Sequence, residues 1–246
     1  MIYFAGDFHL GAPDRASSDQ REKDVCAWLN FAGQQGNEIF LMGDVFDFWF
    51  EYKMAVPKGY FKLLSTMASI TEKGIPITIF KGNHDMWMFG YLEEYCGVKI
   101  ISDELEITRN GKRFFLHHGD GLGPGDFTYK VVRKIFRSAW AQWLFARLHP
   151  NAGIAFATFL SKSSRISKKD HKEKFQGKDK EFLVQFCIKN ANKYDYMIFG
   201  HRHLVLDIQI GENCRYINNG EWVTGRNYTV FDGDTVRLET FQNPSE

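Results

Sequence analysis

Short runs of apolar residues recur along the chain, and four of them end in turns that carry polar side chains. These runs are Ile2–Ala5, 39–42, Ile77–Phe80 and Tyr196–Phe199. Each is too short for a helix, is rich in Ile, Phe or Tyr, and is closely followed by a glycine. Such runs are typical of strands that are buried on both faces. The pattern therefore predicts a sheet whose strands end at polar turns.

Helical periodicity separates the first three of these runs. We expect helices near residues 21–32 and 58–73, and the alternation of strand and helix indicates βαβ units. Asn110-Gly111 lies between two apolar runs within 105–118 and predicts a type I′ hairpin. The last third is mostly strand, with runs at 204–210, 216–219, 228–231 and 236–241 and a tight turn at Asp232-Gly233. The expected fold class is α/β, with two sheets in a sandwich and helices on its flanks.

The stretch 127–169 differs from the rest of the chain. It contains nine Lys or Arg residues and no Asp or Glu. Its large apolar residues recur at roughly helical spacing, and Lys130, Lys134 and Arg137 lie on another face. We expect a helical insert, or cap, at 128–180, interrupting a core formed by 1–127 and 181–246. We call the apolar residues at this spacing the aromatic stripe; they are Val132, Phe136, Trp140, Trp143 and Leu144. The alternative is that the aromatic stripe is ordinary core packing.

Composition narrows the class of protein. The 246 residues carry 31 basic and 30 acidic side chains, a balance that does not favour a nucleic-acid partner. Four scattered cysteines without a CxxC pair indicate reduced thiols rather than a disulfide framework. We see no signal peptide and no apolar run near the ~20 residues that a spanning helix needs. We therefore expect a cytoplasmic protein that at most associates with a membrane surface.

Candidate metal ligands stand at the ends of the predicted strands. Alone, each such Asp or His is more often a turn or core residue than a ligand. Asp7 and His9 are two residues apart and so share one face of an extended segment, as do His201 and His203. Mixed carboxylate, imidazole and amide ligands suit Mn, Fe, Zn or Co better than calcium, and seven ligands suit two ions better than one. The seven are Asp7, His9, Asp44, Asn83, His118, His201 and His203.

The order of these motifs resembles that of the calcineurin-like metallophosphoesterases. The matching residues are Asp7-Phe8-His9, 43–47, 82–85, His118-Gly119-Asp120 and 200–203. The resemblance implies two divalent ions, with manganese expected, bridged by Asp44. One ion would be held by Asp7, His9, Asp44 and His203, and the other by Asp44, Asn83, His118 and His201. It further implies that His84 faces the scissile phosphate and that Asp85 orients His84. We expect His117, on the opposite strand face, to be structural.

The run at residues 43–49 and the insert resemble one branch of that family, which cleaves the pyrophosphate of acylated UDP-sugars in lipid A biosynthesis. His84 departs from the better-known members of that branch, which have Arg at this position, and follows the wider family. The resemblance implies an acylated UDP-sugar substrate under the cap and an anionic inner-membrane surface as partner. Two alternatives stay open: a phosphoesterase acting on nucleotides or other phosphodiesters, and a non-catalytic scaffold. The implied substrate contacts are Asp126, Tyr129, Ser164, Arg165, Lys168 and Lys169.

Overall fold

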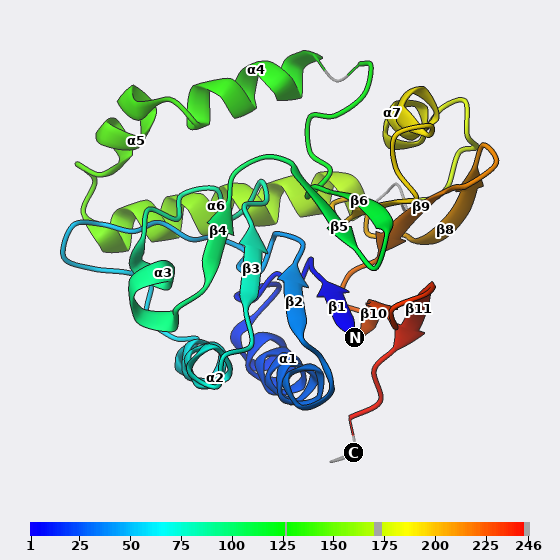
Figure 1. Ribbon diagram of the computed structural model, residues 1–246. Coiled ribbons are helices and arrows are strands. Elements are labelled where there is room, and N and C mark those ends of the chain that lie inside the picture. The colour runs from blue at the N-terminus through cyan, green and yellow to red at the C-terminus, as the bar shows by residue number, and fades with distance from the viewer. Residues whose placement is uncertain (126, 170–173, 244–246) are drawn as a thin grey trace.

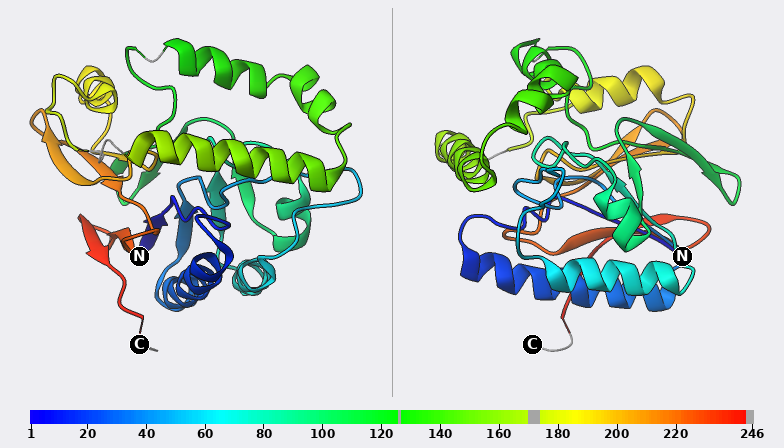
Figure 2. Two further views of the ribbon diagram at one scale, coloured as in Figure 1. Left: turned by 180° about the vertical axis from the view of Figure 1, so that it is seen from behind. Right: turned by 90° about the vertical axis from the view of Figure 1, so that its left-hand side faces the viewer.

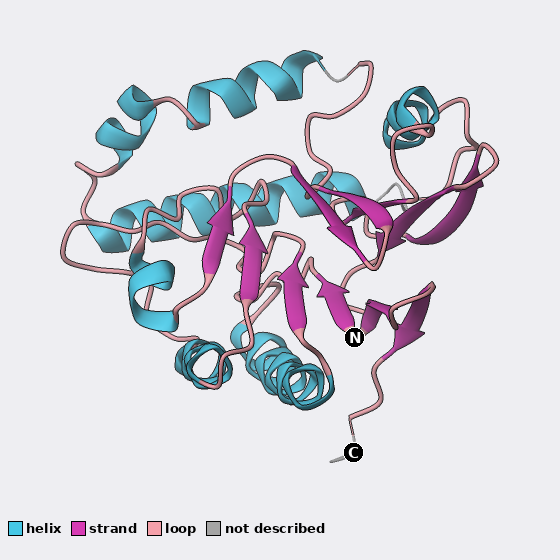
Figure 3. Ribbon diagram, in the orientation of Figure 1, coloured by secondary structure: helices cyan, strands magenta, loops and turns pink. Residues whose placement is uncertain are grey.

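A computed structural model describes residues 1–125, 127–169 and 174–243, without the side chains of 162–169. It contains two β-sheets with helices on their outer faces, and three further helices that cross one end of the sheets (Figures 1 and 3). Along the chain the elements are β1 (Ile2–Ala5), α1 (Arg15–Gln35), β2 (Glu38–Leu41), α2 (Phe61–Glu72), β3 (Ile77–Phe80), α3 (Tyr91–Cys96), β4 (Lys99–Ile101), β5 (Leu105–Arg109), β6 (Lys112–Leu116), α4 (Phe127–Phe136), α5 (Ala139–Phe145), α6 (Pro150–Lys169), α7 (Phe182–Asn190), β7 (Tyr196–Phe199), β8 (Val205–Ile210), β9 (Cys214–Asn219), β10 (Asn227–Phe231) and β11 (Val236–Thr240).

The first sheet contains six strands in the order β11-β10-β1-β2-β3-β4. β1 to β4 are parallel, as the βαβ pattern predicted, and β10 and β11 extend the sheet by antiparallel pairing. The second sheet has the order β5-β6-β7-β9-β8. Its β5–β6 hairpin turns at Asn110 and Gly111, both at positive φ, which confirms the predicted turn.

Two apolar layers hold the sandwich together because alternate residues of a strand point to opposite faces. Ile2 and Phe4 of β1 pack against the second sheet, in a cluster that includes Phe40, Phe114 and Ile198. The intervening Tyr3 and Ala5 pack in the other cluster, which fills the space below the sheet against α1 and α2. On the far side, α7 covers the second sheet. The predicted α/β sandwich of two sheets is therefore confirmed.

Helices α4, α5 and α6 lie within the stretch that we expected to be an insert, and they run across the carboxyl ends of β1 to β4 (Figures 1 and 2). No residue of α4 or α5 is buried. Trp140 is 69% exposed and Phe136 is 41% exposed, and the other members of the aromatic stripe are exposed as well. The alternative that this stripe is ordinary core packing is therefore wrong. The division into a core and a separate cap stays a prediction.

Sequence patterns located most elements and missed the short ones. The predicted helix at 21–32 is longer, spanning Arg15–Gln35, because Asp14 caps its start by accepting from the Ser17 amide. α3, β4 and α7 were not predicted; α3 and β4 have six and three residues, too few for a periodic signal. Within the described residues, no helix combines the length and apolarity required to cross a membrane.

Candidate metal centre

The topology brings the predicted ligands to one edge of the sandwich. Asp7 follows β1, Asp44 follows β2 and Asn83 follows β3, and the carboxyl ends of these parallel strands meet at the same edge. In the second sheet, β6 and β7 are also parallel, so His118 and His201 emerge side by side. The rings of these two histidines lie 5.2 Å apart, centroid to centroid.

The backbone is unusual at these positions. Asp7, His9, Asp44, His201 and His203 all have positive φ, between 45° and 68°. A left-handed conformation costs an ordinary residue free energy, and such residues concentrate at functional sites. The glycines beside them are needed for space: a Cβ at position 82 would collide with the Asp44 carboxylate, and one at position 200 with that of Asp7. The glycines of the Gly82-Asn83 and Gly200-His201 turns therefore reflect close packing as well as chemistry.

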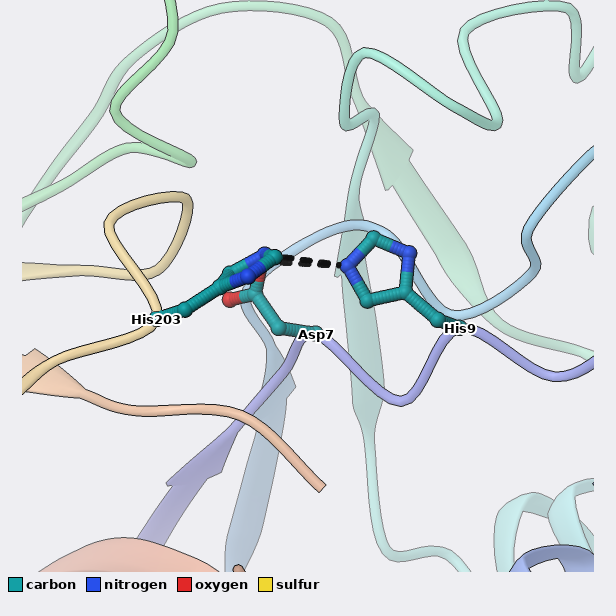
Figure 4. Close-up of side chains that lie close together, drawn as sticks. All are labelled: Asp7, His9 and His203. Atoms are coloured by element: carbon teal, nitrogen blue, oxygen red, sulfur yellow. Dashed lines mark hydrogen bonds and ion pairs between the residues drawn. The ribbon is translucent and has the colours of Figure 1, made fainter. Parts of the chain in front are cut away.

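Asp7, His9 and His203 form one half of the centre (Figure 4). The Nε2 atoms of His9 and His203 face each other at 3.1 Å, and His203 Nε2 lies 3.3 Å from Asp7 Oδ1. Both Asp7 oxygens accept the backbone N–H of His201, at 3.1 and 3.0 Å, which fixes the carboxylate. Two ring nitrogens and one carboxylate therefore converge on a single point.

Asn83, His118 and His201 form the other half. Asn83 Oδ1 lies 3.3 Å from His118 Nε2 and 2.9 Å from His201 Nδ1. The Nδ1 atom of His118 is 2.8 Å from the Met42 carbonyl, so it carries the proton and leaves Nε2 as the donor to a metal.

Asp44 lies between the halves. Its Oδ2 atom is 3.8 Å from His9 Nε2 and 3.5 Å from His118 Nε2. Its Oδ1 atom accepts the His84 amide at 2.8 Å. Asp44 therefore lies within reach of both groups, and the structure brings all seven predicted ligands together.

The donor set fits divalent metal ions. Asp7, Asp44, His9 and His118 are all buried, and buried carboxylates normally need a cation or strong donors. Burial opposes a charge on His118, but the Asp44 carboxylate outweighs it and raises the pKa of His118 to about 10. Burial lowers the pKa of His201 to about 3 and also lowers that of His9, which keeps both rings in the neutral, metal-binding form. Without a metal, a proton on His118 supplies the positive charge that the buried carboxylates favour, and a bound cation would take the place of that proton.

His84 lies at the mouth of this centre, and Asp47 rather than Asp85 contacts its ring. His84 Nδ1 is 3.1 Å from the Asp47 carbonyl and 3.4 Å from the Asp47 carboxylate. The Asp85 carboxylate instead accepts the backbone N–H groups of Val45 (2.8 Å), Phe46 and Gly82 (2.8 Å). Asp85 thus joins the loops after β2 and β3, and the side chain that contacts the His84 ring is that of Asp47 rather than the predicted Asp85. Asp47 is the last residue of the family-matching stretch 43–47, and that position was the signal in the sequence that could have identified it.

His117 has the structural role that we predicted. It is buried, its Nδ1 atom accepts the Gly119 N–H at 2.8 Å, and burial lowers its pKa to about 4. The neighbouring Asp120, which we had not singled out, is buried as well and accepts the Tyr129 hydroxyl at 3.0 Å. An ion pair with Arg133 also joins Asp120 to α4. The insert is thus attached directly to a metal-site motif.

An apolar cavity of about 280 Å³ opens from the metal centre toward the insert. Asn83 and His84 line its inner end, and the opposite walls come from α4, α5 and α6. Tyr129, a predicted substrate contact, lies in this lining. Asp126 lies outside the described residues, as do the side chains of Ser164, Arg165, Lys168 and Lys169. The helical lining residues are Tyr129, Val132, Arg133, Phe136, Phe145, Phe156, Ala157, Leu160 and Ser161.

Several known proteins resemble this chain in sequence. The sequence model of the calcineurin-like phosphoesterases matches residues 1–205. UDP-2,3-diacylglucosamine hydrolase of Porphyromonas gingivalis is 32% identical over 98% of both chains, and that of Histophilus somni is 26% identical over 82% of this chain and 83% of its own. Among solved structures, the phosphoesterase Yfce from E. coli has 15% identity and a TM-score of 0.46, covering 96% of this chain and 90% of its own. The chain therefore belongs to the calcineurin-like phosphoesterase family and is a metal-dependent hydrolase.

Proposed function

We propose that the chain cleaves the pyrophosphate of UDP-2,3-diacylglucosamine to UMP and 2,3-diacylglucosamine 1-phosphate, a step of lipid A biosynthesis. Relatives that align over nearly the whole chain have the name UDP-2,3-diacylglucosamine hydrolase. The observation that carries the proposal is the apolar cavity, because it begins at His84 and continues under the insert. An acyl chain there would gain roughly 0.8 kcal/mol for each methylene removed from water.

The metal ligands, His84, Asp47 and Tyr129 would have different roles in this hydrolysis. The seven ligands would hold two divalent ions, with manganese expected, and Asp44 would bridge them. When bound, such ions polarise the phosphoryl oxygens and promote ionisation of the attacking water. His84 faces the cavity, so its ring would donate to a phosphoryl oxygen or to the leaving group, and Asp47 would hold that ring in place. The Tyr129 ring would border the bound substrate beside His201.

We further propose that the insert touches the cytoplasmic face of the inner membrane. The exposed Trp140 and Trp143 suit a membrane interface, and the Arg147 guanidinium lies 4.6 Å over the Trp143 ring. The same stretch is basic and without acidic residues, which favours an anionic surface. Arg165, Lys168 and Lys169 would add to this charge or meet the sugar phosphate. Ser164, which directly precedes Arg165, and Asp126, which directly precedes α4, would be further substrate contacts.

The test compares three substrates with the manganese-loaded protein. Hydrolysis of UDP-2,3-diacylglucosamine should exceed that of the unacylated UDP-sugar, because only the first can fill the apolar cavity. Bis(p-nitrophenyl) phosphate reports the metal centre alone. Equal kcat/KM for the acylated and unacylated sugars would refute the lipid assignment and favour a phosphoesterase for nucleotides.

A further inference from the structure

Helix α6 turns one face toward the core. Gly153 lies against Tyr52 and Phe145, so closely that a Cβ there would overlap the Tyr52 hydroxyl. Ala157, Leu160 and Ser161 line the cavity, four, seven and eight positions after Gly153. This spacing places them on the same side of the helix. The position of Ser161 is therefore set by how α6 sits on the core.

Ser161 reaches a carboxylate of the catalytic motifs. Its Oγ atom lies 3.0 Å from both Oδ1 and Oδ2 of Asp47. Both side chains are buried, with 8% of Ser161 and 5% of Asp47 exposed. Asp47 Oδ1 in turn lies 3.4 Å from His84 Nδ1 and 3.7 Å from Nδ1 of the ligand His9. One carboxylate thus joins a hydroxyl of the insert to the histidine that faces the cavity.

We propose that Ser161 is a positioning residue: it holds the Asp47 carboxylate against His84, so that the metal centre is fully active only while α6 is seated. A buried carboxylate that loses a donor is destabilised and adopts another rotamer or recruits water. Displacement of α6 would therefore release Asp47 and, through it, the His84 ring. This inference rests on the phosphoesterase reaction of the proposed function and does not require the lipid substrate.

The first experiment measures kcat and KM of Ser161→Ala and Ser161→Thr on both the acylated UDP-sugar and bis(p-nitrophenyl) phosphate. Ser161→Ala should lower kcat about 10-fold on both, the usual effect of removing a contact that orients a catalytic group, with little change in KM. Ser161→Thr keeps the hydroxyl and should restore kcat. Ser138→Ala is the matched control, because Ser138 caps α5 in the same insert. It should leave both rates near those of the unchanged protein.

The second experiment is a double-mutant cycle in kcat with Asp47→Asn, with metal content measured for each variant. If Ser161 acts through Asp47, then Ser161→Ala should cause no further loss in the Asp47→Asn protein. An equal loss in both backgrounds, or a wild-type kcat for Ser161→Ala, would overturn the inference. Measurement on both substrates separates the test of the lipid substrate from the test of Ser161. If the acylated UDP-sugar proves not to be the substrate, the rates of diester hydrolysis still test the role of Ser161.

Discussion

Ala157→Phe should separate binding of the acyl chain from the chemistry at the metal centre. Ala157 lies on the cavity wall in α6, facing the cavity of about 280 Å³, and a phenyl ring there would occupy part of that volume. If the ring excludes about four methylene groups, each contributing roughly 0.8 kcal/mol, binding loses about 3 kcal/mol. That loss corresponds to a roughly 100-fold lower kcat/KM for UDP-2,3-diacylglucosamine.

Hydrolysis of bis(p-nitrophenyl) phosphate should be unchanged, because a small diester needs the metal centre and not the apolar walls. Ala155→Phe is the matched control: the same substitution in the same helix, at an exposed position. The assay is steady-state kinetics on both substrates, with thermal unfolding to detect overpacking. If Ala157→Phe and Ala155→Phe have the same kcat/KM for the lipid, the cavity does not bind the acyl chains.

Four further predictions concern the centre and the insert. Asp44→Ala should lose both metal ions, as measured by elemental analysis, and should also lose hydrolytic activity. A variant that retains two equivalents of metal per chain would contradict a bridging Asp44. His84→Ala should keep its metals but lose turnover by roughly 10²–10⁴-fold, the range of one acid or electrostatic donor; unchanged turnover would make His84 structural. Trp140→Glu should weaken binding to anionic vesicles in a sedimentation assay without slowing diester hydrolysis, and vesicle binding should fall as salt rises. Because burial lowers the pKa of His117 to about 4 from 6.5, the unfolded chain takes up the proton first. The contribution of His117 to stability should therefore fall as the pH falls from about 6.5 to 4, by up to roughly 3 kcal/mol, which urea titrations would measure as the difference between the unchanged protein and His117→Gln.

The ligands could be predicted from sequence because their signal is local. A strand end followed by Gly-Asp or Gly-His places the ligand at the carboxyl edge, and parallel pairing then brings separate strand ends together. The same local signal explains the positive φ of Asp44 and His201, each directly after a glycine in a sharp turn. Fold class followed equally from the spacing of strands and helices.

Contacts between distant parts of the chain could not be predicted. Asp47 and Ser161 are 114 positions apart, and no spacing in the sequence relates them. The family resemblance implied that Asp85 orients His84, yet the Asp85 side chain turns toward the amides of Val45 and Gly82. A residue's neighbours in sequence do not determine its hydrogen-bond partners when the chain reverses at a tight turn.

The position of β1 in the first sheet has a consequence for the timing of folding. β1 pairs on one side with β2, where Ile2 lies opposite Glu38, and on the other with β10, where Ile2 lies opposite Phe231. The turn after β1 also contacts a segment far along the chain, because the backbone N–H of Trp222 donates to the Asp7 carbonyl oxygen at 3.1 Å. During synthesis, β1 keeps an unpaired edge until the ribosome has released residues beyond 231. The strand that leads into the first two ligands is thus synthesised well before β10, the strand that completes its pairing.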